Sequence, residues 1–341
     1  MKKLLTIFLV VLSTTWIMAG DKVAEQIMQG YEDGSAKKED TLAKLKMRKD
    51  ALAKAGKAEE AKEVEEMIES MADEGDDQAG KPSGTQSKSK NDYLIVDLKS
   101  RKLTYSATPP PDLLKNDKYK TDKLVMRRIP AGTFMMGETG KQHKVTLTKD
   151  FYIGVFEVTQ GQWENMMKAN PSEFKDVGKD APVEQVSWED CQNFMKELNG
   201  RKSSSLAFRL PTESEWEYAC RGGDKKTSKG FKYSGSGTLD EVAWFKDNSG
   251  GKTHPVGKKK ANELGLYDMS GNVWEWCSDW FGEYSKEPEK DTVGAKSGTV
   301  RILRGGGWDC DAGYCRSALR LDRAPTHRGH NVGFRLVLPA Q

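Results

Sequence analysis

Tryptophan and cysteine are concentrated in the part of the chain beyond residue 160. That part holds all five Cys and eight of the nine Trp among the 341 residues. Large aromatic rings bury enough area to stabilise a fold that is rich in loops. The distribution therefore predicts one folded, Trp-rich C-terminal domain that follows a polar N-terminal region.

The charged residues are nearly balanced, which excludes one large class of function. The chain has 54 Lys and Arg against 51 Asp and Glu, a net charge of +3. A protein that binds nucleic acid through its phosphates usually carries a clear basic excess, so we expect no nucleic-acid partner. A phosphate-binding loop is also absent from the sequence, because the RGGG at 304–307 lacks the Lys and the Ser or Thr that complete such a loop.

The N-terminus has the pattern of an export signal. Met1, Lys2 and Lys3 precede an apolar run, and Ala19 provides a small residue near its end. This pattern is typical of a secretory signal, so residues 1–19 are predicted to be a signal peptide. The alternative is an uncleaved anchor helix, but the stretch is short for a membrane span of roughly 20 residues. We expect an exported protein (periplasmic, secreted or at the cell surface) without an integral membrane domain after signal removal.

Three further segments follow the signal. Residues 21–73 are rich in Ala, Lys, Glu and Met, and their apolar residues recur at helical spacing with an interruption at Gly56. They are predicted to form a helical stalk or hairpin, which is either a spacer or an oligomerisation or docking element. Residues 74–92 hold nothing to bury and are predicted to be a flexible linker. Residues 93–341 form the folded domain.

Within that domain, short elements of both kinds are predicted. The segment YLIVDL at 93–98 and the following KLTYSA read as a strand pair. Ser187 stands at the N-cap of a helix with Asp190 three residues on, close to a capping box. Another short helix is expected at 214–220. Because few segments keep one period for long, we expect an α+β fold with short strands and much irregular structure, not a doubly wound sheet.

Seven sequence blocks in a fixed order give the domain a family resemblance. The blocks are IPAGTFMMG, FEVTQGQW, PVEQVSWEDC, RLPTESEWEYACRGG, GLYDMSGNVWEWCSDW, RILRGGGWDC and NVGFRLV. Together they cover residues 124–339 and resemble, in content and order, the formylglycine-generating enzyme (sulfatase-modifying factor) family. The resemblance implies that family's variant of the C-type-lectin fold. It implies an activity less strictly, because the family also contains non-catalytic display proteins, kinase-linked modules and iron enzymes.

The same resemblance implies a structural calcium ion at the segment GNVWEW. Asn272 and Glu275 would bind the ion through their side chains, and Gly271 and Val273 through their carbonyl groups. Oxygen donors of this kind suit Ca²⁺. The alternative is an ordinary turn with a capped Asn.

Cys310 and Cys315 are the candidate catalytic residues. In the family's aerobic enzymes, two Cys five residues apart after a Gly-Gly turn bind copper(I) as thiolates, the ligand type that selects this ion. The resemblance then implies an oxidase that converts a Cys of a target polypeptide, such as a sulfatase, to formylglycine. Counted forward from the Gly-Gly turn, Cys310 and Cys315 fall on the catalytic pair.

The same region also departs from the enzymes. Counted back from the closing GFR the stretch is shorter, so Cys315 leaves the second catalytic position. Gly307 stands where the enzymes have Ser, Asp311 stands where they have His, and residues 323–331 replace the segment that lines their peptide groove. Two alternatives to a copper site therefore stay open: buried thiols, or a Cys310–Cys315 disulfide in an oxidising compartment.

Polar and aromatic residues interspersed among scaffold residues suggest a different function. The candidate ligand-facing residues are Asp309, Asp311, Tyr314, His327 and His330. In C-type-lectin-fold proteins that are diversified by retroelements, such positions form a ligand-binding face. The alternative function is therefore a non-catalytic exported module that binds a cell-surface ligand through a protein or glycan surface. The alternative is neutral sequence change at the surface of a non-catalytic family member, which would produce a similar mixture of residue types.

Two expectations concern the remaining aromatic and thiol groups. By resemblance, Trp276 lines the cleft next to the Cys pair, although the Trp rings of this domain are expected mainly in the core. Cys191, Cys220 and Cys277 are expected to be structural. The odd number of Cys means that at least one thiol is free or paired between chains.

Overall fold

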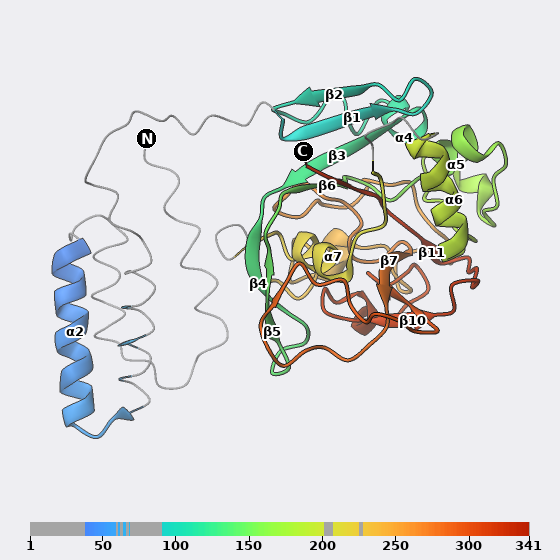
Figure 1. Cartoon of the computed structure of the whole chain (residues 1–341). Coiled ribbons are helices and arrows are strands. Elements are labelled where there is room, and N and C mark those ends of the chain that lie inside the picture. The colour runs from blue at the N-terminus through green and yellow to red at the C-terminus, as the bar shows by residue number, and fades with distance from the viewer. Residues whose placement is uncertain are drawn as a thin grey trace. The chain divides into compact units, whose positions relative to one another are not determined.

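A computed structural model describes residues 38–58, 61, 64–65, 68, 91–200, 207–224 and 228–340. The chain divides into two compact units, Met1–Thr85 and Gln86–Gln341. The predicted signal peptide lies outside the described residues, as do the first part of the predicted stalk and most of the predicted linker (Figure 1).

The N-terminal unit contains helix α2 (Lys38–Lys54) and helical residues beyond a turn. Gly56 makes this turn with a φ of +74°, a left-handed conformation that favours glycine. Lys49 on α2 forms an ion pair with Glu65 beyond the turn. Buried apolar side chains lie on both sides of it: Leu45, Leu52, Val64 and Ile68. The described part of this unit is therefore a helical hairpin with its own small core.

The C-terminal unit is built on three sheets (Figure 1). The first is antiparallel, in the order β12-β6-β3-β1-β2. Its strands are β1 (Tyr93–Asp97), β2 (Leu103–Ser106), β3 (Lys123–Ile129), β6 (Phe151–Gly154) and β12 (Val337–Pro339). The predicted pairing of YLIVDL with KLTYSA is confirmed, with Tyr93 opposite Ser106 and Val96 opposite Leu103. Because β12 joins this sheet, the two ends of the unit are held together.

The second sheet carries the region that the sequence marks as functional. Its order is β10-β9-β7-β11, with β11 parallel to β7 and the other pairs antiparallel. The strands are β7 (Trp274–Trp280), β9 (Arg301–Arg304), β10 (Leu321–Arg323) and β11 (Val332–Gly333). A third, smaller sheet has the order β4-β5-β8 and consists of β4 (Gly132–Met136), β5 (His143–Leu147) and β8 (Glu289–Lys290).

Three of the helices begin with a complete capping box, in which a Ser or Thr side chain and the third helical residue satisfy each other's backbone N–H groups. They are α5 (Gln160–Met167), α6 (Trp188–Asn199) and α7 (Glu213–Cys220), capped by Thr159, Ser187 and Thr212. The N-cap predicted at Ser187, with Asp190 as its partner, is confirmed. Short helices at α4 (Lys118–Thr121) and α8 (Leu239–Val242), and 3₁₀ turns at Lys175–Val177 and Ala312–Cys315, complete the unit.

Helix α7 is the centre of the unit, because all eight of its residues are buried. Its acidic side chains are therefore paired internally. Glu217 forms a fully buried ion pair with Arg304 of β9, and Glu213 accepts two hydrogen bonds from Arg320, at 2.7 and 2.9 Å. These pairs connect the helix to the second sheet and to the C-terminal loops. The architecture is the α+β class that the sequence predicts, with short strands and long irregular connections.

Candidate functional site

A cleft of about 590 Å³ opens beside the second sheet and brings together residues that are far apart in the sequence. The 3₁₀ turn at Ala312–Cys315, strand β10 and the loop 324–331 supply most of its wall. The lining residues are Gln185, Trp274, Leu303, Asp309, Cys310, Asp311, Tyr314, Leu321, Arg323, His327, Arg328, Gly329, His330, Asn331 and Val332. The sequence suggested six side chains for a ligand face or its cleft, and all except Trp276 lie in this lining: Asp309, Asp311, Tyr314, His327 and His330.

Apolar side chains that line the cleft belong to the sheet beneath it. Trp274, Leu303 and Val332 are each at most 2% exposed and come from β7, β9 and β11. Leu321 of β10 is partly exposed and packs against the hydrophobic core cluster that contains these three side chains. The pattern of an apolar floor with a few polar groups is common in ligand sites.

Most of the charged side chains of the cleft are already paired within the protein. Arg328 makes a two-pronged contact with Asp190, at 2.7 and 2.9 Å. Asp311 accepts a hydrogen bond of 3.0 Å from Lys246. Arg323 differs, because its guanidinium donates to the adjacent carbonyl of Asp322 at 2.8 Å and not to a carboxylate. Among the described residues it makes no ion pair.

The other acidic group of the cleft, Asp309, is held by an amide. Both of its carboxylate oxygens accept from Asn331 Nδ2 at 3.0 Å. His330 Nε2 lies 3.9 Å from the same carboxylate, and the His330 ring is 5.3 Å from the ring of Trp308. Phe174 makes an edge contact with Trp308, also at 5.3 Å. One end of the cleft is therefore an aromatic group around a fixed carboxylate.

Three other lining side chains, Tyr314, His327 and Arg323, make fewer contacts within the protein. Tyr314 is 48% exposed and is one of the few large apolar side chains at the surface. Burial, with a smaller effect from Arg323, lowers the pKa of His327, so this ring is neutral at neutral pH. The side chains of this group that are available to a ligand are an aromatic ring, a neutral imidazole and the Arg323 cation.

The loop that closes the cleft is positioned by residues that sequence patterns did not single out. Gln185 has a φ of +63°, and its backbone N–H donates to the Gly329 carbonyl at 2.9 Å. Trp274 and Leu303 form the floor. Nothing in their spacing marks these three residues, since their roles depend on which distant loops the fold brings together.

The two candidate catalytic thiols occupy different environments. Cys310 lines the cleft, and its thiol lies 3.6 Å from a carboxylate oxygen of Asp309. Cys315 is fully buried and does not line the cleft. It packs in an apolar cluster with Tyr233, Leu239, Val242, Ala243 and Phe245. Cys310 packs against that cluster from outside, so the two residues are near each other but only one reaches the ligand space.

Both thiols are held in the protonated form. Burial raises the pKa of Cys310 to about 11, with a further contribution from Asp309, and burial raises the pKa of Cys315 strongly. A copper(I) site needs thiolates, and these environments oppose their formation. Because Cys315 is also sealed in the core while only Cys310 lines the cleft, the present residues fit copper poorly.

The alternative of a Cys310–Cys315 disulfide does not hold in this structure, where all five Cys are free thiols. Cys191, Cys220 and Cys277 are buried. Gly306, which has a φ of +82°, backs against Cys315: a Cβ added there would lie 2.8 Å from its sulfur. The glycine-rich turn is thus required for close packing around the buried thiol.

Trp276 does not line the cleft. It is fully buried, and its indole N–H donates to the Val186 carbonyl at 3.0 Å. Strand β7 is buried on both faces over most of its length. The alternation of side chains between the two faces of the sheet therefore does not bring Trp276 to the surface. Its place is in the core.

Asn272, one of the two predicted calcium ligands, is engaged within the protein. Its amide oxygen accepts from the His254 backbone N–H at 3.0 Å, and its amide nitrogen donates to Glu157 at 2.8 Å. The φ of Asn272 is +62°, a conformation that Asn adopts more readily than most residues. The side chain thus serves as a turn residue, the alternative that its sequence context allowed.

Glu275, the other predicted ligand, lies in a buried ion pair with Arg335, whose Nε and Nη2 atoms each donate at 2.7 Å. The Trp216 indole N–H donates to one of the same oxygens, also at 2.7 Å. Each carboxylate oxygen can accept two hydrogen bonds or ligands. One oxygen of Glu275 therefore retains a free lone pair.

Carboxylates beside this ion pair carry more negative charge than Arg335 compensates. Asp268 Oδ1 is buried and has no hydrogen-bond partner. Burial, followed by the charges of Asp268 and Glu275, raises the pKa of Glu157 well above its ordinary value, and burial raises the pKa of Asp268 to about 6. An orphaned carboxylate oxygen in such a cluster suits a hard cation. Asp268 and Glu275 fit calcium, whereas Asn272 does not.

Such an ion would need backbone donors as well. Among the described residues, no group of three or more His, Cys, Asp or Glu side chains is arranged to hold a metal ion. The carbonyl groups of Gly271 and Val273, expected from the family resemblance, are the donors that would complete the set.

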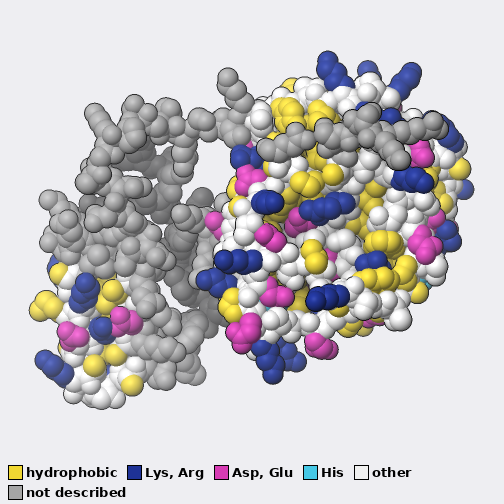
Figure 2. All heavy atoms as spheres, in the orientation of Figure 1, with side chains coloured by type: hydrophobic (Ala, Val, Ile, Leu, Met, Phe, Trp, Pro, Cys, Tyr) yellow, Lys and Arg dark blue, Asp and Glu magenta, His cyan; other side chains and the backbone are white. Residues whose placement is uncertain are grey.

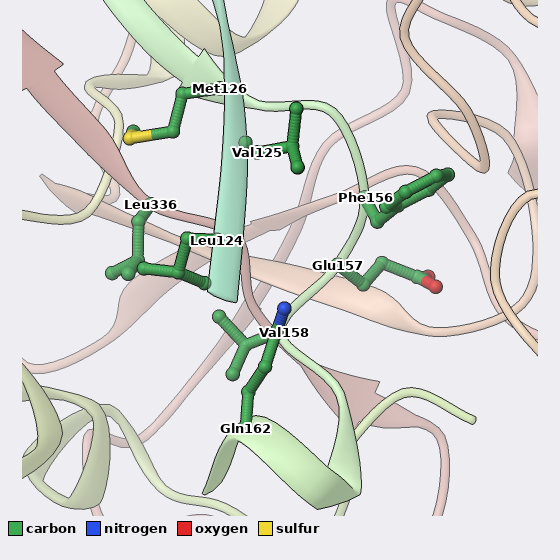
Figure 3. A pocket seen from close by; sticks show the side chains of 9 residues that line it. Leu124, Val125, Met126, Phe156, Glu157, Val158, Gln162 and Leu336 are labelled. Atoms are coloured by element: carbon green, nitrogen blue, oxygen red, sulfur yellow. The ribbon is translucent and has the colours of Figure 1, made fainter. Parts of the chain in front are cut away.

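A second pocket, beside Glu157, is too small for a ligand (Figure 3). Its volume is about 10 Å³, which is room for roughly one water molecule. The Glu157 side chain extends away from the apolar side chains of Leu124, Val158 and Leu336. This pocket is a packing defect between the first sheet and α5, and the cleft remains the candidate site.

Charged side chains of both signs share the face of the molecule shown in Figure 2. On the face shown in Figure 2, Lys and Arg side chains are interspersed with Asp and Glu. Within the described part of the chain, no helix is both long enough and apolar enough to cross a membrane.

The fold and the cleft define a family of proteins. The family described as the sulfatase-modifying factor enzyme 1-like domain (FGE-sulfatase) matches residues 111–340. This protein belongs to that family, and its C-terminal unit has the formylglycine-generating-enzyme variant of the C-type-lectin fold.

Several curated relatives share the domain. The "Chaperone protein LppX" of Paenibacillus barcinonensis is 38% identical over 236 residues, which cover 55% of this chain and 79% of that protein. The "Formylglycine-generating enzyme" of Streptomyces coelicolor is 36% identical over 169 residues, covering 45% of this chain and 51% of that enzyme. The "Formylglycine-generating enzyme" of Bos taurus is 36% identical over 171 residues, covering 46% of this chain and 43% of that enzyme. The chain thus spans about half the length of the formylglycine-generating enzymes that it matches.

Two solved structures are similar over nearly their whole length. "Treponema denticola variable protein 1" is 32% identical with a TM-score of 0.58, covering 64% of this chain and 96% of its own. PvdO from Pseudomonas aeruginosa is 26% identical with a TM-score of 0.54, and the match covers 64% of this chain and 95% of PvdO. The domain is therefore similar both to proteins named as enzymes and to one named as a variable protein.

Proposed function

We propose that the C-terminal unit is a binding module of an exported protein, and that it captures a protein or peptide ligand in the cleft without oxidising it. The observation that carries this proposal is the contrast between the cleft and the thiols. Exposed aromatic and charged side chains gather around an apolar floor, while only one of the two sulfurs needed for copper reaches this space and the other is sealed in the core. The similarity to a variable protein supports the same function.

A library of phage-displayed random dodecapeptides tests the proposal. We expect the full chain to enrich peptides that the variant Tyr314→Ala/His330→Ala binds at least tenfold more weakly, since both residues line the cleft. Val293→Ala is the matched control, because Val293 is 66% exposed but does not line the cleft. Equal binding by all three proteins would exclude the cleft as the ligand site.

The second candidate is the activity that gives the family its name, conversion of a Cys in a target protein such as a sulfatase to formylglycine. One observation favours it: Cys310 lines the cleft and packs against the cluster that holds Cys315. Copper(I) titration of the wild-type protein and of Cys310→Ser separates the two functions. The binding module predicts that both proteins take up the same copper, and the oxidase predicts one additional equivalent in the wild type.

We also propose a structural calcium ion held by Asp268 and Glu275 with the carbonyls of Gly271 and Val273. The buried Asp268 oxygen without a partner supports it. A ligand that binds only the folded state raises the unfolding temperature, so millimolar calcium should raise that of the wild type after EDTA treatment and leave Asp268→Ala unchanged. Lys258→Ala, altered at an exposed position, is the control and should respond like the wild type. No shift in the wild type would contradict the proposal.

A further inference from the structure

Strand β10 (Leu321–Arg323) forms one edge of the second sheet. It pairs with β9 through Leu321 opposite Leu303 and Arg323 opposite Arg301. On its other side, no strand of the described residues pairs with it. Free backbone N–H and C=O groups on a sheet edge are a template for an added strand.

The side chains of this edge strand lie in the wall of the cleft. Leu321 and Arg323 both line the cleft, whereas Asp322 between them does not. The two side chains are two residues apart and therefore lie on one face of the strand. An added strand would thus meet an apolar position and a cationic position on the same face, in that order.

Charge complementarity defines what such a strand should carry. Arg328 and Asp311 are neutralised by Asp190 and Lys246, and both oxygens of Asp309 are held by Asn331. Arg323 is exposed and, among the described residues, makes no ion pair. An acidic residue of the ligand opposite Arg323 would supply the missing charge, because opposite charges on facing strand positions stabilise the pairing.

We propose that the cleft binds an extended peptide segment as an additional strand on β10, and that the segment carries an apolar and an acidic residue two positions apart. The apolar side chain packs beside Leu321, and the carboxylate pairs with Arg323. This inference rests on the proposed binding function and names its ligand class. The edge strand has only three residues, so it can pair with only a short segment of the peptide. The affinity for the peptide therefore depends on its side chains as well as its backbone.

Matched peptides test the spacing and the charge. The probes are acetyl-Thr-Val-Thr-Glu-Thr-amide and its reverse, acetyl-Thr-Glu-Thr-Val-Thr-amide, which cover parallel and antiparallel addition. Acetyl-Thr-Val-Glu-Thr-Thr-amide has the composition of the first probe but places the two side chains on opposite faces. We expect one of the first two to bind at least tenfold more tightly than the third in fluorescence anisotropy. Equal binding of all three would overturn the proposal.

Charge-reversal variants test whether Arg323 is the residue that selects the acidic side chain of the peptide. Arg323→Glu should weaken binding of the Glu peptide at least tenfold and strengthen binding of the corresponding Lys peptide. Lys296→Glu reverses an exposed charge that does not line the cleft and should leave both affinities unchanged. Equal effects of the two variants would mean that net charge, not Arg323, selects the peptide, and would overturn the assignment.

Backbone pairing has its own readout. N-methylation of the better peptide at one of two consecutive residues should abolish binding, and methylation at the other should not, because only every second N–H group of an added strand faces the sheet edge. If both methylated peptides bind normally, the edge strand is not used, although the binding function stands. If no phage-displayed peptide and neither pentapeptide binds the wild type, the binding function itself fails.

Discussion

At the scale of single residues, Asp279 is a buried carboxyl group whose ionisation opposes folding. Burial, followed by the negative charge of Glu213, raises the pKa of Asp279 to about 7. The group is buried, and one oxygen accepts from the Glu213 backbone N–H at 2.9 Å and from Ser278 at 2.9 Å. Since its pKa is near 3.8 in the unfolded chain, the folded state binds one more proton between about pH 4 and pH 7.

Asp279 should therefore make the protein less stable as the pH rises through this window. Its contribution is fully present below about pH 4 and lost above about pH 7, on the order of 2–4 kcal/mol. In Asp279→Asn the amide keeps one acceptor and does not ionise. We expect the unfolding free energy of the variant minus that of the wild type to increase from pH 4 to pH 8 in urea titrations, because only the wild type loses stability over this range. A difference that stays constant over this range would contradict the assignment.

At the scale of elements, Arg304 holds β9, α7 and the loop that precedes β10 together. Its guanidinium donates to the carbonyls of Ser317, Ala318 and Leu319 at 2.6–2.9 Å and pairs with Glu217. Removal of one partner from a buried ion pair costs about 3–5 kcal/mol, because the other charge stays buried. Arg304→Met should lower the unfolding free energy by about this amount.

The double variant Arg304→Met/Glu217→Gln is the control for this explanation. Glu217 also pairs with Arg221 at 2.7 Å, so loss of Arg304 removes one of its two cationic partners. Once Glu217 is neutral this loss costs less, so the double variant should be more stable than the sum of the single effects. Chemical unfolding of all four proteins measures this coupling. Strict additivity would mean that the carbonyl contacts of Arg304, not the ion pair, provide its stabilising effect.

The same elements show what sequence reasoning could reach. Local signals such as the Ser187 cap depend on neighbouring residues and were predictable. Arg304 and Arg335 were not singled out, because their partners lie 60–87 residues away in the chain and nothing local marks them. Trp276 was misplaced toward the cleft for a related reason: strand β7 is buried on both faces, so its residue pattern does not distinguish a cleft side from a core side.

At the scale of the whole molecule, the family and fold were predictable because seven blocks with fixed order constrain the entire domain. That the five candidate residues lie together was also predictable, since they come from two segments, 309–314 and 327–330, that meet in the cleft; their role toward a ligand stays a prediction. The state of the two thiols was not. Whether Cys315 faces solvent or the cluster around Phe245 depends on the packing of a loop 70 residues away, and the Cys spacing is compatible with either.

The division into two units leads to the last prediction. The N-terminal unit buries Leu45, Leu52, Val64 and Ile68 within itself, while β1 belongs to the first sheet of the C-terminal unit, with Leu94 and Val96 fully buried. A chain that begins at Gln86 should therefore unfold within about 2 °C of the full chain, a change of less than 1 kcal/mol. A chain that begins at Arg101 loses β1 from between β2 and β3, and its unfolding temperature should fall far more. If the two truncated chains lost equal stability in calorimetry, the C-terminal unit would depend on residues before Gln86, and its independence would be disproved.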